Sequence, residues 1–154
     1  MHQITRSQIV SLSLEEAWEF FSSPKNLKFL TPDALNFQIL KAAETMYPGM
    51  IIIYKVSPLF NIPITWVTEI THIHDKSFFV DEQRVGPYSM WHHEHHFKEV
   101  EGGVEIKDII TYKLPLGFIG KGLNALFVEK QINEIFDYRN KKMETLPIHK
   151  DPKS

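Results

Sequence analysis

Hydrophobic positions along the chain follow two different periods. Between residues 13 and 23 the apolar residues recur at the three- and four-residue spacing of one helix face. Ser13 and Glu16 form a capping-box pair at the start of this segment, and Pro24 follows its end. From residue 35 to 114 apolar and polar residues alternate instead, as they do in strands that bury one face. The pattern predicts a short helix followed by β-structure.

Turn residues divide the rest of the chain into recognisable elements. Pro48-Gly49, Gly86-Pro87 and Glu101-Gly102-Gly103 separate β-prone runs, and a further β-prone run opens the chain. A second short helix is expected after Ser23-Pro24. A long helix is expected over about residues 121–146, with an apolar stripe of Val128, Ile132, Ile135 and Met143. The expected fold class is α+β: a seven-stranded curved antiparallel sheet around a long C-terminal helix, with two short helices after the first strand.

Composition narrows the function classes. The chain has 154 residues, 17 Lys plus Arg and 19 Asp plus Glu, so we expect a single domain over 1–154 with a polar tail at about 147–154. A net charge of −2 gives no electrostatic case for nucleic acid as a partner. No apolar run approaches the ~20 residues of a membrane span, and no signal peptide is evident, so we expect a cytoplasmic protein without membrane insertion. With no cysteine, thiolate chemistry and disulfides are excluded.

The chain resembles the START-like, or SRPBCC, superfamily of helix-grip domains, and most of all the polyketide cyclase/dehydrase-like proteins of bacteria. Four stretches between residues 3 and 146 carry the resemblance: SLEEAWEFFSSPKNLKFLTP, ITWVTEI, FFVDEQRVGPYSMWHHEHHF and IITYKLPLG. The resemblance implies a deep, mostly apolar pocket between the sheet and the C-terminal helix. It implies no particular chemistry, because the superfamily includes lipid carriers, receptors, cyclases, hydroxylase domains and co-chaperones.

A histidine-rich strand is the most unusual local feature of the sequence. In His92-His93-Glu94-His95-His96, alternation places His93 and His95 on one face. Such a pair can chelate zinc if a neighbouring strand brings a third ligand, but the sequence shows no preset third ligand and no helical H-E-x-x-H motif. We therefore expect no metal and no other cofactor.

Strand parity selects the residues that face the interior. If the Glu101–Gly103 turn has a two- or four-residue loop, Trp91, His93, His95 and Phe97 share a face with Ile106, Asp108, Ile110 and Tyr112; a three-residue loop would reverse the pairing. The turn can be centred on Glu101-Gly102 or on Gly102-Gly103. His95 lies directly opposite Asp108 in the first case and diagonal to it in the second. The same parity argument, applied across the Gly86-Pro87 turn, places Phe78, Val80 and Glu82 on the inner face. Phe79, on the other face, is an equally apolar candidate for the interior. The expected ligand-binding residues are Trp66, Glu82, Trp91, His93, His95, Asp108 and Tyr112.

Three functions remain open at this point. The first is a carrier or sensor that binds an apolar or amphipathic small molecule in the pocket. The second is a cyclase or dehydratase acting on a polyketide-like or aromatic substrate, with His95 and Asp108 as an acid–base pair. A buried Asp–His hydrogen bond that merely orders the sheet is the structural alternative to that pair. The third is an interaction protein with a filled cavity. The oligomeric state and the ligand are not encoded in any recognisable pattern.

Overall fold

The computed structural model describes residues 1–59, 62–115 and 121–146. Seven strands and two α-helices form its framework, and two short 3₁₀ segments, η1 and η2, follow the first helix. In chain order the elements are β1 (His2–Val10), α1 (Leu14–Phe21), η1 (Pro24–Leu27), η2 (Asp33–Leu35), β2 (Gln38–Lys41), β3 (Met50–Leu59), β4 (Ile62–His74), β5 (Phe78–Val85), β6 (Met90–Val100), β7 (Gly103–Lys113) and α2 (Lys121–Glu144).

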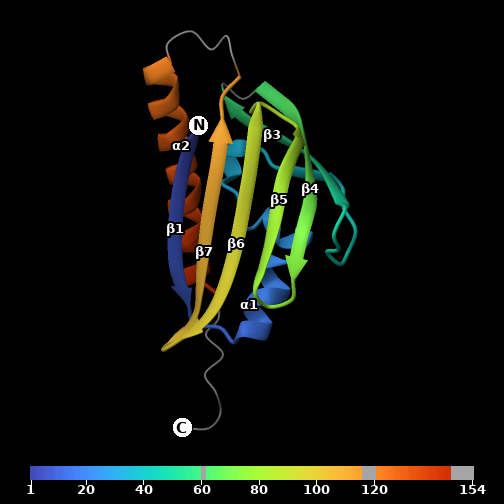
Figure 1. Cartoon of the computed structure of the whole chain (residues 1–154), viewed down its shortest axis with the longest axis vertical. Helices are drawn as coiled ribbons and strands as arrows, with labels where there is room; N and C mark the ends of the chain where they lie inside the picture. The colour runs from blue at the N-terminus through green and yellow to red at the C-terminus, as the bar shows by residue number, and fades with distance from the viewer. Residues whose placement is uncertain (60–61, 116–120, 147–154) are drawn as a thin grey trace.

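All seven strands belong to one antiparallel sheet with the order β1-β7-β6-β5-β4-β3-β2. Strands β2 to β7 therefore follow one another as neighbours, and β1 joins the far edge beside β7. Helix α2 lies along one face of this sheet, behind β1 and β7 (Figure 1). The predicted fold class, a curved antiparallel sheet around a long C-terminal helix, is confirmed. The predicted tail at 147–154 lies outside the described residues.

Local sequence signals fix the start of α1. The hydroxyl of Ser13 accepts a hydrogen bond from the Glu16 N–H, and the Glu16 carboxylate accepts one from the Ser13 N–H at 2.9 Å. This capping box satisfies backbone groups that the first helical turn leaves without partners. The apolar face that follows buries Ala17, Trp18 and Phe21. The segment after Pro24, expected as a helix, forms a short 3₁₀ turn.

The β6–β7 turn sets the register of the inner face. Val100 pairs with Gly103, which leaves Glu101-Gly102 as a two-residue turn. Gly102 has a φ of 89°, a value that glycine adopts without steric cost. A Cβ on Gly103 would lie 2.0 Å from the Val10 carbonyl oxygen, so a side chain there would collide with the end of β1. The predicted pairing of Trp91 with Tyr112 and of His95 with Asp108 follows from this turn.

The described apolar core is divided among three clusters rather than joined in one. One surrounds Trp18 and Phe97 beneath α1, a second joins Ile110 and Tyr112 to the α2 residues Ile132 and Phe136, and a third contains Met50, Ile52 and Ile70. Of the predicted α2 stripe, Ile132 and Met143 are buried, while Val128 and Ile135 are half-buried. Phe136, which the predicted stripe omitted, is buried as well.

Within the described part of the chain, neither helix combines the length and apolar character needed to cross a bilayer.

We predict that Ile132→Asp will destabilise the fold by about 3–5 kcal/mol, because it places an unpaired carboxylate in the cluster between α2 and the sheet. Glu134→Asp, which puts the same side chain on the exposed face of α2, is the matched control and should cost under about 0.5 kcal/mol. Urea unfolding measures both. An unchanged unfolding midpoint in Ile132→Asp would contradict the packing of α2 against the sheet.

Candidate functional site

A cavity of about 230 Å³ lies between α2 and the sheet. Members of all three apolar clusters border it, so the cavity occupies the space that separates them; they include Phe21, Phe79, Ile52, Ile70, Ile132 and Phe136. Its wall also contains an aromatic group, made of Tyr54, Trp66, Tyr88 and Trp91, and a polar group, made of Asp81, His93, His95 and Arg139. An apolar hollow with a few convergent polar side chains is the usual composition of a small-molecule site.

Four of the residues predicted from the sequence border this cavity: Trp66, Trp91, His93 and His95. Asp108 and Tyr112 share the inner face but are not part of the cavity wall, and both are buried, with Tyr112 fully so. Asp108 lies behind the two histidines. Whether any of these side chains contacts a ligand stays a prediction.

The inward orientation predicted for Glu82 is wrong. Phe79 pairs with His95 and Asp81 with His93, so the odd-numbered residues of β5 share the inner face. Glu82 instead pairs with His92 on the opposite face, where its carboxylate lies 2.9 Å from the His92 ring and 3.1 Å from Arg84.

The physical reason is the β5–β6 connection, which is longer than a tight hairpin. The side-chain amide of Gln83 donates to the Tyr88 carbonyl at 2.7 Å, and the Tyr88 N–H donates back to Gln83 at 3.2 Å. The last pair before this connection is Glu82 and His92, and the number of residues between them is odd. With an odd number, residues of β5 and β6 that share a face are both odd-numbered or both even-numbered, the reverse of what a two-residue hairpin gives.

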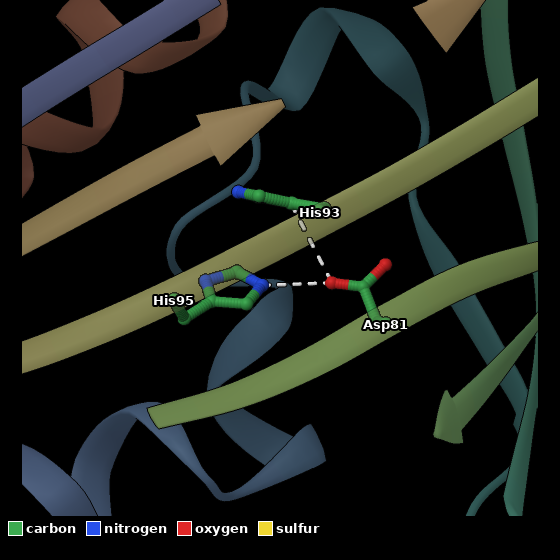
Figure 2. Close-up of side chains that lie close together, drawn as sticks. All are labelled: Asp81, His93 and His95. Atoms are coloured by element: carbon green, nitrogen blue, oxygen red, sulfur yellow. Dashed lines mark hydrogen bonds and ion pairs between the residues drawn. The ribbon is translucent and has the colours of Figure 1, made fainter. Parts of the chain in front are cut away.

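Asp81 is the polar residue that this reversal brings inward (Figure 2). Its Oδ2 accepts a hydrogen bond from His95 Nε2 at 2.7 Å and lies 3.5 Å from His93 Nδ1. Asp81 comes from β5 and both histidines from β6, so the cluster joins two neighbouring strands at the cavity wall. His95 also stacks on the ring of Phe79, with 4.1 Å between ring centroids.

Asp108 supports both histidines from behind. Its Oδ1 accepts a hydrogen bond from His93 Nε2 at 3.0 Å. The same oxygen lies 2.8 Å from His95 Nδ1, but the angle is poor for a hydrogen bond, so this contact is chiefly electrostatic. Each imidazole therefore has one nitrogen turned to Asp81 and the other to Asp108.

Arg139 connects this cluster to α2. Its guanidinium lies 3.4 Å from Asp108 Oδ1 and packs over the rings of Phe21 and Phe136, with centroid distances of 4.9 and 5.5 Å. Arginine tolerates such a position because its weakly hydrated, planar cation can stack on aromatic rings. The helix thus contributes the positive charge that the buried carboxylates need.

Burial and neighbouring charge act in opposite directions on the pKa values of this cluster. Burial alone would raise the pKa of Asp108, but Arg139 and the contacts with the two histidines hold it well below its usual range. Burial would likewise raise the pKa of Asp81, yet His95 and His93 lower it overall. Burial and the charge of His95 lower the pKa of His93, whereas the two carboxylates outweigh burial and raise the pKa of His95.

The pKa directions favour charges that offset one another. The lowered pKa values favour ionised Asp81 and Asp108, and the raised pKa of His95 favours a cation beside Arg139. Opposite charges close together reduce the cost of burying each of them. The hydrogen bond between His95 and Asp81 lies at the cavity wall, so this pair, rather than His95 with Asp108, lies where a bound molecule could reach it.

The aromatic group contains a polar atom without a partner. Trp66 stacks on Tyr54 and meets Trp91 edge-on, with centroid distances of 5.9 and 5.5 Å. Its indole Nε1 is buried and has no hydrogen-bond partner among the described residues. A buried donor of this kind favours an acceptor from water or from a bound molecule. Burial also raises the pKa values of Tyr54 and Tyr88, so both phenols stay protonated donors at neutral pH.

The expectation of a metal-free site rested on the absence of a third ligand, and that premise needs correction. Asp81, His93 and His95 offer three ligand atoms that all lie within 4.8 Å of one another. The sequence prediction also missed Arg139 as part of the site, although its place between Ile135 and Met143 on the same helix face could have indicated an inward cation. For Asp81, the available signal was the alternation of Phe79 and Asp81, which competed with that of Phe78 and Val80.

Comparison with known proteins identifies the fold. No family model and no curated protein matches the chain. Among solved structures, TTHA0849 from Thermus thermophilus has 16% sequence identity and a TM-score of 0.71, covering 93% of this chain and 94% of that one. Protein NE0264 from Nitrosomonas europaea has 11% identity and a TM-score of 0.69, covering 92% and 91%. Ara h 8.0201 has 13% identity and a TM-score of 0.62, covering 94% and 98%.

At these identities the likeness establishes architecture alone. The chain has the helix-grip fold of the START-like, or SRPBCC, superfamily, which is also the Bet v1-like fold. The resemblance inferred from the four sequence stretches is thereby confirmed at the level of the fold. The function is not settled by this likeness and follows from the site.

We predict that Asp108→Ala will destabilise the protein by about 3–5 kcal/mol, because it leaves His93, His95 and Arg139 buried around a missing anion. Glu82→Ala removes a carboxylate from a histidine pair on the solvated face and should cost under about 1 kcal/mol. Urea unfolding of the two variants gives the comparison. Equal losses in both would show that the Asp108 cluster does not stabilise the fold.

Proposed function

We propose that this protein binds a small apolar or amphipathic molecule in the cavity between α2 and the sheet, as a carrier or sensor. The main observation that supports this proposal is the cavity itself, which separates the three apolar clusters and combines apolar walls with polar groups. A cavity that the surrounding large side chains leave open gives up packing contacts, and a ligand would restore them.

The size and lining of the cavity narrow the ligand class. A cavity of about 150 Å³ accommodates benzene, so 230 Å³ suits a molecule of about one or two rings. Tyr54, Trp66, Tyr88 and Trp91 offer ring faces and edges for an aromatic or flat ligand. The unpartnered Trp66 N–H and the polar group supply hydrogen bonds for one or two polar atoms of that ligand. An amphipathic aromatic compound fits this description best.

An enzymatic role is the second candidate, and one observation favours it. The hydrogen-bonded pair of His95 and Asp81 borders the cavity, where it could take a proton from a bound molecule or return one to it. Proton transfer of this kind is what a cyclase or dehydratase acting on a polyketide-like or aromatic substrate requires. The third alternative, an interaction protein with a filled cavity, is disfavoured by the open volume.

We predict that a fluorescent apolar probe will bind saturably to the protein and that Ile135→Trp will abolish this binding. Ile135 borders the cavity from α2, so the larger indole would occupy the space. Glu134→Trp, which adds the same side chain on the exposed face of the helix, should bind the probe normally. Fluorescence titration measures the affinity. Equal binding by both variants would place the probe elsewhere and remove the support for the proposal.

We also predict that Trp91→Ala will weaken the probe about fivefold to tenfold, the equivalent of about 1–1.4 kcal/mol for one aromatic contact. Tyr47→Ala, an exposed aromatic outside the cavity wall, serves as the control.

Native mass spectrometry of freshly purified protein should show a co-purifying ligand of one or two rings. To separate carrier from enzyme, that ligand is incubated with wild-type protein and with His95→Gln: chemical change in the wild type alone marks an enzyme.

A further inference from the structure

We propose that Asp81, His93 and His95 form a binding site for one divalent first-row transition-metal ion in the wall of the cavity. Their donor atoms, Asp81 Oδ2, His93 Nδ1 and His95 Nε2, lie within 4.8 Å of one another (Figure 2). Within the described residues, this is the one group of three histidine and carboxylate side chains whose ligand atoms converge. All three side chains are largely buried, unlike the exposed acidic clusters that often lack a metal.

Side-chain movements alone would bring the donor atoms to the spacing that such an ion needs. Bonds of about 2.0–2.1 Å to nitrogen and oxygen place neighbouring ligand atoms about 3.0–3.4 Å apart. Asp81 Oδ2 lies 2.7 Å from His95 Nε2 and 3.5 Å from His93 Nδ1, so these two distances need shifts of a few tenths of an ångström. The two histidine nitrogens lie within 4.8 Å of each other and would have to approach by up to about 1.5 Å. Side-chain rotation can provide such shifts without moving the paired strands.

The hydrogen bond between His93 and Asp108 orients the His93 ring for metal binding. Because the Asp108 carboxylate accepts this bond, His93 Nε2 carries a proton. The other ring nitrogen, Nδ1, faces the carboxylate oxygen of Asp81 at 3.5 Å. Nδ1 is therefore the nitrogen that an ion between His93 and Asp81 would bind.

Asp108 also provides the outer support that metal-binding histidines usually have. A histidine ligand commonly donates its other ring N–H to a carboxylate, which fixes the tautomer and the ring orientation. Asp108 Oδ1 lies 3.0 Å from His93 Nε2 and 2.8 Å from His95 Nδ1, so one carboxylate can serve both rings. Binding of the ion would displace the proton of His95 Nε2, which is released to solvent. The buried Nδ1 is then the nitrogen left to donate to Asp108, and a small ring rotation would align that bond.

The donor set indicates the class of ion. Two imidazoles and one carboxylate suit Zn²⁺, Fe²⁺ and related ions, whereas Ca²⁺ and Mg²⁺ prefer oxygen ligands alone. Three protein ligands leave coordination positions open, and these face the cavity because all three residues border it. A polar atom of the ligand in the proposed function could occupy one of them. The metal site itself does not depend on that function.

The opposite face of β6 provides matched controls. His92 lies 2.9 Å from Glu82, and His96 lies 2.9 Å from Glu94, so the same residue types occur there as separate, partly exposed pairs.

Untagged protein is treated with EDTA, dialysed free of chelator and titrated with Zn²⁺ by calorimetry. We expect one equivalent to bind with micromolar affinity or tighter. Asp81→Asn and His95→Gln should each weaken binding at least a hundredfold, and Asp108→Asn by about ten- to a hundredfold. His92→Gln and His96→Gln should bind as the wild type does.

A second measurement on the wild-type protein removes any dependence on how the variants fold. Addition of Zn²⁺ should shift the ring nitrogen resonances of His93 and His95, and leave those of His92 and His96 unchanged. The absence of saturable binding to the wild type would overturn the proposal. So would Zn²⁺ binding that depends on His92 or His96, or histidine shifts confined to the outer face.

The two proposals can fail separately. Ile135→Trp should lose the apolar probe and still bind Zn²⁺, because Ile135 borders the cavity but is not one of the three metal ligands. Probe binding without Zn²⁺ binding would overturn the metal site alone. Zn²⁺ binding without probe binding would overturn the proposed ligand function alone.

Discussion

The buried carboxylate of Asp108 is the charge around which the inner face is organised. It lies on β7, contacts two histidines of β6 and pairs with Arg139 of α2, so it connects the sheet to the helix that covers it. A buried anion is tolerated only when hydrogen bonds and opposite charge surround it. The positions of His93, His95 and Arg139 therefore depend on one another. Asp81 then completes the cluster on the cavity side, where its carboxylate lies beside both histidines.

This arrangement distinguishes two contacts of His95, of which the sequence had indicated only the one with Asp108. Asp108 is buried and is not part of the cavity wall, whereas Asp81 and His95 both border the cavity. The two contacts belong to one network, with the histidines between the two carboxylates. In a mostly apolar cavity, a few polar groups placed in this way can fix the orientation of a bound molecule.

The sequence predicted the architecture well because its signals were local. Ser13 and Glu16 marked the start of α1, and the two-residue turn at Glu101-Gly102 fixed which residues of β6 face Asp108. The same parity rule failed for β5, because the hydrogen bonds of Gln83 to Tyr88 stabilise a longer connection that no residue pattern announced. Glu82 and Asp81 exchanged faces as a result. The helical spacing of Arg139 could indicate an inward position but not its partner, because Asp108 lies on a strand and only packing brings the two together.

The place of β1 in the sheet has a consequence for how the protein is made. Its partner is β7, so β1 cannot form its sheet hydrogen bonds until β7 has left the ribosome. Pairing between distant segments is slow, because the entropy of closing the loop is lost before the contacts form. During synthesis the early strand edge is therefore unpaired and open to wrong partners. The cavity wall includes side chains of α2, so it is complete only after that helix has been synthesised and packed onto the sheet.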